Sequence, residues 1–489
     1  MINIHGNARG ARPVAWLVAS VVSAGLAGAA APAIAATPEP PAPPARWQLD
    51  PSFGDGGTAV TYFQDDSQHG TWGFDVAMQP DGKIVIAADS HRSGPPGPSP
   101  SWMGAARYLP NGELDPTFGD GGIVEVAWGR AVHTFTLELQ QIGDEVKIVV
   151  GGHLYAKSSP RHRFAVMRLN ADGSLDTKDD ADPDRHLGRD GRKAVAFAGD
   201  QAFGLDLTIS PDRRIVVAGY VDVGAGDHVP ALARLLPRSG RLDPAFGDDG
   251  RLTLDVGGQF ETVTADRGPE GVQIVAGGGV RVQGGGTSWH LARFDHDGAL
   301  DPTFGDGGTT RFRMSTADCA FSYQQASDVA VTAEGKVVAV GDGCVDDEIG
   351  APVAIPAVAR LRPNGSLDPS FSDDGRAFPV PDLPADASEQ PARGLELGSD
   401  GRIFWSGWIA YPSGGPRAQM FVGGLRANGS PDPQFGPAGY QQIDVGPGPD
   451  EAEAITSDGD GRLVVVGLAN AGGLSIHDGI ALARLRLPS

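Results

Sequence analysis

The chain has 489 residues, of which 71 are glycine and 39 are proline, and its formal net charge at pH 7 is −22. This much glycine and proline excludes a protein of long helices and favours many short strands joined by turns. The negative charge argues against a nucleic-acid partner, because an acidic surface repels the phosphate backbone.

The first 35 residues have the features of an export signal. Two arginines precede an apolar, alanine-rich run from Val14 to about Ala31, and Ala33-Ile34-Ala35 fits a signal-peptidase site. We predict a signal peptide at 1–35, a proline-rich linker at 36–46, and export to the periplasm or the medium. The alternative is that the run anchors the chain in a membrane, although it is short for a span. No later stretch is long enough for one, so no span is expected after cleavage.

A nine-residue anchor, Leu-Asp-Pro-Thr-Phe-Gly-Asp-Gly-Gly at 114–122, recurs along the rest of the chain. The copies from Leu175 and Pro431 are the least regular. The second residue of the anchor is always an aspartate: Asp50, Asp115, Asp176, Asp243, Asp301, Asp368 and Asp432. Their separations of 65, 61, 67, 58, 67 and 64 residues indicate seven repeats of a single unit.

Each repeat contains the pattern of two hairpins. A half-buried stretch such as 74–79 leads through a Pro-Asp-Gly turn into the β-branched run 83–87. After a longer loop comes a third strand, such as 105–109, and the turn Asn111-Gly112 leads into the anchor. Four strands per repeat, arranged radially, predict an all-β fold: a seven-bladed β-propeller of four-stranded blades over residues 47–489. A linear β-solenoid is the alternative, although its coils are usually shorter than this period.

The two ends of the repeat region complement each other. The last repeat stops at Ala481–Leu487, a third strand with no anchor after it, and an anchor without a blade stands at 47–54. We predict that the N-terminal strand closes the last blade, which leaves no free sheet edge in the ring. Leu49 and Phe53 should then pack beneath the last strand, and Asp50 should take the role of the other anchor aspartates.

The anchor, together with Gln-Pro-Asp-Gly-Lys-Ile-Val at 79–85, resembles the delta-60 repeat of exported bacterial proteins. The resemblance covers residues 47–487 and implies a β-propeller. It implies no reaction and supplies no catalytic residues. The copies from Leu175 and Pro431 depart from the pattern, which puts the local geometry of their blades in doubt.

The connections between the second and third strands are long and differ between repeats, whereas the hairpin turns are short. In an antiparallel blade they lie on the same face as the links between blades, and variable loops on a rigid scaffold are where binding normally resides. We call this face the long-loop face, and its segments are 90–103, 155–163, 220–229, 280–288, 343–357, 410–418 and 469–478. We expect an exported, non-catalytic binding or scaffold propeller, a monomer, that recognises a protein, a glycan or a small molecule there.

Motifs that would identify a reaction are missing from the sequence. There is no Gly-x-Ser-x-Gly elbow, His-Glu-x-x-His, phosphate loop or Cys-x-x-Cys, and the 11 histidines show no pair at ligand spacing. Propeller enzymes assemble their sites from separate blades, so a secreted hydrolase or lyase with a carboxylate or metal site at the channel mouth is the alternative. Side chains that could lie near this mouth are His69, Trp72, His133 and Glu453.

Two sets of carboxylates are candidate calcium ligands, and calcium is the one cofactor that the sequence suggests. Asp75, Asp206 and Asp328 share one aligned position of the first strand, which should line the channel. The alternative is that each accepts hydrogen bonds from N–H groups of its own blade. A second set, in an insertion after Leu175, alternates as at the start of a calcium loop: Asp180, Asp182 and Asp184. The EF-hand pattern fails after these residues, so a solvated acidic loop is the alternative there.

Two further patterns concern stability. The third strand carries an arginine in six of seven repeats, which suggests a bridge between neighbouring blades, with an anchor aspartate as its partner: Arg107, Arg168, Arg234, Arg293, Arg360 and Arg484. Cys319 and Cys344 are the only cysteines. They are expected to form a disulfide, because export places them in an oxidising compartment and both should emerge at the same end of one hairpin.

Overall fold

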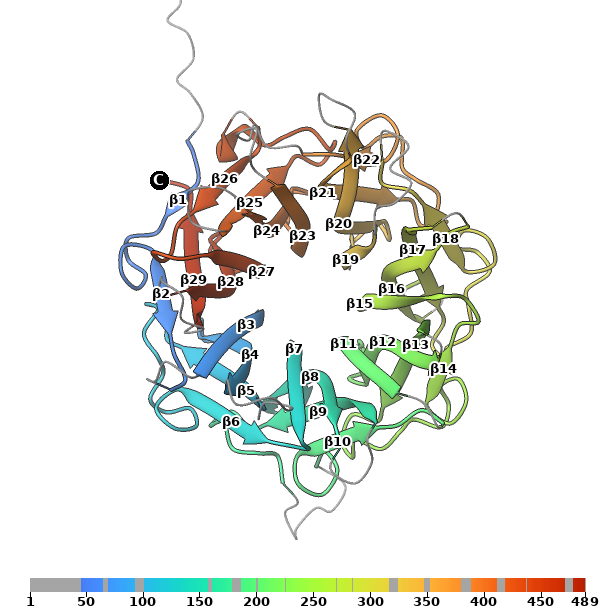
Figure 1. The fold of residues 1–489 in the computed structure, drawn as a ribbon, viewed down its shortest axis with the longest axis horizontal. Coiled ribbons are helices and arrows are strands. Elements are labelled where there is room, and N and C mark those ends of the chain that lie inside the picture. Colours follow the sequence, from blue (N-terminus) through green and yellow to red (C-terminus); the bar gives the residue numbers. More distant parts are fainter. Residues whose placement is uncertain are drawn as a thin grey trace, which may run out of the picture. The chain divides into compact units, whose positions relative to one another are not determined.

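Seven antiparallel sheets stand around a central channel, one for each copy of the anchor (Figure 1). The computed structural model describes residues 45–64, 69–92, 101–156, 161–177, 186–198, 201–224, 226–269, 271–283, 285–315, 324–346, 352–379, 388–410, 418–436, 438–470 and 478–488. All of them belong to one compact unit, Pro44–Ser489. The predicted seven-bladed propeller is therefore confirmed. No helix in this part of the chain has the length and apolar character that a membrane span requires.

The strands follow the chain from the channel outward in each blade. Blade 1 contains β3 (His69–Met78), β4 (Ile84–Arg92), β5 (Ser101–Tyr108) and β6 (Ile123–Ala127); blade 2 contains β7 (Ala131–Ile142), β8 (Glu145–Tyr155), β9 (His162–Leu169) and β10 (Arg192–Val195). Blade 3 contains β11 (Gln201–Ile209), β12 (Ile215–Gly224), β13 (Asp227–Leu235) and β14 (Arg251–Thr253); blade 4 contains β15 (Gly258–Gly268), β16 (Gly271–Arg281), β17 (Thr287–Phe294) and β18 (Thr309–Phe312). Blade 5 contains β19 (Ala326–Val331), β20 (Val337–Asp346), β21 (Pro352–Leu361) and β22 (Arg376–Ala377); blade 6 contains β23 (Ser388–Leu397), β24 (Ile403–Ala410), β25 (Ala418–Leu425), the short 3-10 helix η1 (Pro433–Phe435) and β26 (Tyr440–Ile443). Blade 7 contains β27 (Asp450–Ser457), β28 (Leu463–Asn470) and β29 (Asp478–Arg486), together with the N-terminal β1 (Gln48–Leu49) and β2 (Thr58–Thr61).

The second strand of each blade contains an apolar run because both faces of this run are buried. In β4, Val85 and Ala87 pack against Ile148 and Val150 of blade 2. The alternate residues, including Ile86, pack against blade 7 instead. A strand that contacts a neighbour on either side has no solvent face, so the sequence shows a continuous β-branched run instead of an alternating pattern.

The N-terminal segment closes the ring as predicted. Both β1 and β2 pair with β29, so the last blade takes its outer strands from the start of the chain. Phe53 is fully buried, and Leu49 packs in the adjacent cluster with Leu485. Arg484 Nε donates to Asp50 Oδ2 over 3.0 Å, as Arg107 donates to Asp115 within its own repeat over 2.8 Å.

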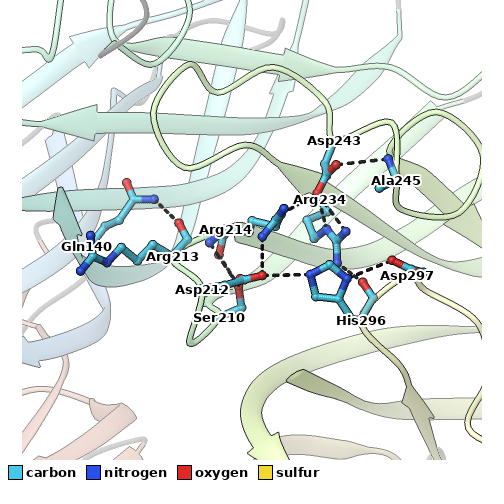
Figure 2. Close-up of polar contacts among 10 residues, drawn as sticks. All are labelled: Gln140, Ser210, Asp212, Arg213, Arg214, Arg234, Asp243, Ala245, His296 and Asp297. Atoms are coloured by element: carbon cyan, nitrogen blue, oxygen red, sulfur yellow. Dashed lines mark hydrogen bonds and ion pairs between the residues drawn. The ribbon is translucent and has the colours of Figure 1, made fainter. Parts of the chain in front are cut away.

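In six of the seven blades, the arginine of the third strand joins its blade to the next. Arg234 is 1% exposed, its Nε donates to Asp243 Oδ2 over 2.9 Å, and the guanidinium lies 4.6 Å from the centre of the Phe246 ring. Its Nη1 donates to the carbonyl oxygen of His296 in blade 4. Figure 2 shows this junction, with Arg214 also directed at Asp243. The interblade contact recurs from the other arginines of this set, to the carbonyl oxygens of Ala171, Pro237, Pro363, Ala427 and Pro110.

Blade 6 has Gly424 where the other blades have this arginine, and it uses a different side chain. Arg402, the residue before the neighbouring strand β24, donates through Nη1 to Gln434 Oε1 over 2.7 Å and lies 3.5 Å from Asp432 Oδ2. Its guanidinium lies 5.2 Å from the centre of the Phe404 ring. The aspartate of this irregular anchor therefore still has a cationic neighbour.

Several predicted features lie outside the described residues. These are the signal peptide at 1–35, the acidic insertion with Asp180, Asp182 and Asp184, and Cys319. Cys344 is buried in β20, and its backbone pairs with that of Ser315, four positions before Cys319 in the sequence. The calcium loop and the disulfide stay predictions.

Candidate functional site

Every first strand carries a β-bulge at the same level of the channel. In each blade the pairing with the second strand skips one residue, and these residues form a set that we call the bulge ring: Phe74, Phe135, Leu205, Glu261, Ser327, Arg393 and Glu453. All seven line a cavity of about 740 Å³ that occupies the channel. Because a bulge redirects a side chain, each blade contributes one residue to the channel wall at this level.

The bulge ring has an apolar part and a polar part. Blades 1–3 contribute two phenylalanines and a leucine, whereas blades 4–7 contribute Glu261, Ser327, Arg393 and Glu453. Burial raises the pKa values of Glu261 and Glu453, and the nearby Arg393 guanidinium acts in the opposite direction. Arg393 Nε lies 3.9 Å from Glu453 Oε2. A ligand in the channel would therefore meet aromatic rings on one side and charged groups on the other.

The predicted channel carboxylates follow the bulge ring by one residue and connect the blades. Asp75 accepts hydrogen bonds from the N–H groups of Val76 in its own blade, at 2.8 Å, and of Leu137 in the next blade, at 2.7 Å. Thr136 Oγ1 lies 3.2 Å from an oxygen of Asp75 and 2.8 Å from one of Asp206. Asp206 and Asp328 bond their own and the next blade in the same manner.

The sequence predicts that the three aspartates either bind calcium or accept hydrogen bonds from N–H groups of their own blade. The structure shows that they accept from N–H groups of their own blade and also of the next blade. Burial raises the pKa of Asp75 to about 7. In the described part of the chain, no three His, Cys, Asp or Glu side chains form a group that could hold a metal ion. Calcium binding by Asp75, Asp206 and Asp328 stays a prediction.

A second cavity, of about 580 Å³, lies between blades 1 and 2 on the long-loop face. We call it the blade 1–2 pocket, and its lining is Trp72, Asp89, His91, Ser101, Arg130, Ala131, His133, Tyr155 and His162. Ser101 Oγ donates to the carbonyl oxygen of Val132 over 2.7 Å and accepts from its N–H over 2.8 Å. These two bonds join β5 to β7 at the pocket and fix the relative position of its walls.

A histidine and a buried carboxylate form a pair in this pocket. His133 Nδ1 lies 2.8 Å from Asp89 Oδ2; the Asp89 side chain is 4% exposed and that of His133 is 44% exposed. The hydrogen bond raises the pKa of His133, and burial raises the pKa of Asp89. The second oxygen, Asp89 Oδ1, has no hydrogen-bond partner among the described residues. Asp89 therefore orients the histidine ring.

His133 should titrate above 6.5, the ordinary histidine value, and Asp89→Asn should lower its pKa. Because the pKa is higher in the folded state, the pair stabilises the fold below the unfolded pKa and this stabilisation is lost as the pH rises through the folded pKa. As the pH falls through the raised pKa of Asp89, the carboxylate is neutralised and the ion pair is also lost. The pKa of His133 in the wild type and in Asp89→Asn is measured by following its ring signals by NMR as the pH is changed.

His153 provides the internal control in the same spectra, because burial lowers its pKa to about 3 and it should stay neutral over the same range. A His133 pKa that is the same in wild type and in Asp89→Asn would contradict the pairing.

A series of aromatic side chains in mutual contact extends from the pocket over blades 2 and 3. His162 stacks on Phe203 with ring centres 4.4 Å apart, and Phe203 stacks on Tyr220 at 4.8 Å. We call the whole set the aromatic belt, and it contains Trp72, Phe74, His91, His133, Phe135, His153, Tyr155, His162, Phe203, Tyr220 and His228. All of its members are half-buried except His153, which is buried, and each ring contacts at least one other ring of the set.

Of the four side chains that the sequence places near the channel mouth, the structure brings two into the same pocket. Trp72 and His133 line the blade 1–2 pocket, and Glu453 lines the channel. His69 lies further along β3, with its ring 6.1 Å from that of Trp102. Sequence reasoning missed Asp89, which ends a β-branched run that reads only as core. The bulge ring could have been found in the sequence by aligning the repeats and comparing the residue that precedes the Asp75 position in each.

A family described as "Domain of unknown function (DUF5122) beta-propeller" matches residues 79–118, 147–178, 210–246, 273–304 and 334–371. The matches support a β-propeller repeat family. Comparison with curated proteins gave no match.

Solved structures with a similar fold include a protein of unknown function from Dyadobacter fermentans, at 13% identity and a TM-score of 0.44 over 88% of this chain and 98% of that one. The polysaccharide lyase Uly1 is similar at 11% identity and a TM-score of 0.43, over 85% and 90% of the two chains. The β-propeller domain of the Trilobed protease from Pyrococcus furiosus is similar at 8% identity and a TM-score of 0.38, over 86% and 96%. At these identities the similarity concerns the fold alone.

Proposed function

We propose that this protein is an exported β-propeller of the delta-60 repeat type that binds a glycan on its long-loop face without transforming it. The aromatic belt is the observation that supports this proposal most strongly. Small-ligand sites are mostly apolar, with a few polar groups that fix orientation, and the blade 1–2 pocket combines both kinds of group. A sugar ring presents an apolar face to an aromatic side chain and hydroxyl groups to the polar ones.

The size of the pocket favours a glycan over a folded protein partner. A volume of about 580 Å³ lies within the usual range for small-molecule sites. A protein interface of standard size needs about 800 Å² from each partner, which is a broader surface than one pocket between two blades.

Binding is tested by isothermal titration calorimetry of the full exported chain with neutral and acidic oligosaccharides. Tyr155→Ala should weaken binding about tenfold, because the ring contributes roughly 1.4 kcal/mol through stacking and burial. Trp408→Ala is the matched control: this residue is also half-buried and lies on the second strand of its blade, β24, away from the belt. Failure of the wild-type chain to bind any member of the panel would reject a glycan-binding function.

The His133–Asp89 pair favours one second candidate, a secreted lyase or hydrolase at the channel mouth. A base held by a buried carboxylate is a common way to position a histidine for proton transfer. In a lyase, the histidine would take the proton beside a sugar carboxylate, the carbon–oxygen bond to the leaving sugar would break, and a carbon–carbon double bond would form. The leaving oxygen would take up a proton. Ultraviolet absorbance of that double bond during incubation with uronate oligosaccharides distinguishes a lyase from a binding protein.

A further inference from the structure

Arg130 is an arginine on the long-loop face for which the structure shows no carboxylate partner among the described residues. It is exposed, its backbone N–H donates to the carbonyl oxygen of Tyr155 over 2.7 Å, and its guanidinium lies 5.2 Å from the centre of the Tyr155 ring. In contrast, Arg281 on the same face pairs with Asp227. The backbone of Arg130 and the Tyr155 ring thus hold this residue at the pocket. Its guanidinium N–H groups form no ion pair with a described carboxylate.

The described lining of the pocket around Arg130 contains three histidines and one carboxylate. The histidines are His91, His133 and His162, and Asp89 is the one carboxylate among the described residues that line the pocket. Asp89 is already engaged with His133. Nearby Asp478 accepts a hydrogen bond from Trp72 Nε1 over 3.0 Å. The net charge of the chain is −22. In this pocket, however, an anion would contact an arginine and imidazole groups instead of many carboxylates.

We infer that the blade 1–2 pocket selects sugars that carry a carboxylate, as in uronic acids, with Arg130 as the residue that binds the carboxylate; this inference rests on the proposed glycan-binding function. A guanidinium binds a carboxylate through two parallel hydrogen bonds, which gives both affinity and orientation. With the carboxylate held there, the sugar ring lies against Tyr155 and Trp72.

Methyl esterification provides a probe that changes the charge and little else. Oligogalacturonate should bind about tenfold or more tightly than the same oligosaccharide in fully methyl-esterified form, since hydrogen bonds between charged groups are the stronger ones. Arg130→Gln should remove this preference, so that the acid and the ester bind with equal affinity. Arg281→Gln removes the same charge from the same face and should keep the preference. Thermal melting of each variant shows whether the fold is intact.

The outcomes separate this inference from the proposed function. Equal binding of acid and ester by the wild type, or an unchanged preference in Arg130→Gln, overturns the selection of carboxylates while glycan binding stands. Binding to neutral oligosaccharides alone would also overturn the selection of carboxylates and leave glycan binding in place. Absence of binding to neutral and acidic oligosaccharides overturns both.

Discussion

A chain that begins at Tyr62 is expected to lose at least about 6 kcal/mol of unfolding free energy relative to one that begins at Ala45, and to aggregate. The shorter chain lacks Trp47 and Phe53, which are 4% and 0% exposed in the intact protein. Burial of each is worth about 1.5–3 kcal/mol. Trp47 also contacts Phe404 and Phe435 of blade 6, with ring centres 5.8 and 5.3 Å apart, so the loss weakens two blades.

Loss of the N-terminal segment also removes the partner of a buried charge. Arg484 is 4% exposed and pairs with Asp50, and a buried charge left without its partner costs about 3–5 kcal/mol. The bare edge of β29 would be open to pairing with another chain. Denaturant unfolding and light scattering measure the two effects. If both chains unfold at the same denaturant concentration and stay monomeric, closure by β1 and β2 does not stabilise the ring.

Arg293→Met should lower the free energy of unfolding by about 3 kcal/mol, because it leaves Asp301, whose side chain is only 16% exposed, without its cation. Arg293 is 6% exposed; its Nε donates to Asp301 Oδ2 over 2.8 Å and its Nη1 to the carbonyl oxygen of Pro363 in blade 5. The guanidinium also lies 4.8 Å from the centre of the Phe304 ring. Methionine keeps much of the length of the side chain but none of these polar contacts. Chemical denaturation followed by tryptophan fluorescence measures the change.

Arg281→Met is the matched control for Arg293→Met. Its side chain is 51% exposed and its pair with Asp227 is open to water, so the change should cost about 1 kcal/mol or less. The double variant Arg293→Met/Asp301→Asn should be more stable than Arg293→Met alone, since the unpaired charge is gone. If Arg293→Met and Arg281→Met cost the same, the arginine set does not hold the blades together.

The blade count and the closure of the ring were determined by the sequence alone. Each anchor sets a turn and a strand through residues that are neighbours in the chain, so seven copies predict seven blades without knowledge of their packing. The complementary ends at 47–54 and 481–487 predict the shared blade in the same way. Asp50 repeats the local context of Asp115, and the structure gives it the equivalent arginine, Arg484.

Only the tertiary structure decided what surrounds the channel. Asp75 bonds the N–H of Leu137, which is 62 positions away, because the first strands of adjacent blades converge at the axis. The bulge ring depends on the register between two strands, a property of their pairing and not of either segment. Asp89 and His133 meet because radial packing places the end of β4 beside the start of β7, and their 44-residue separation matches no ligand spacing. Local patterns specify a blade, whereas the site lies between blades, where residues from separate repeats come into contact only after the ring has formed.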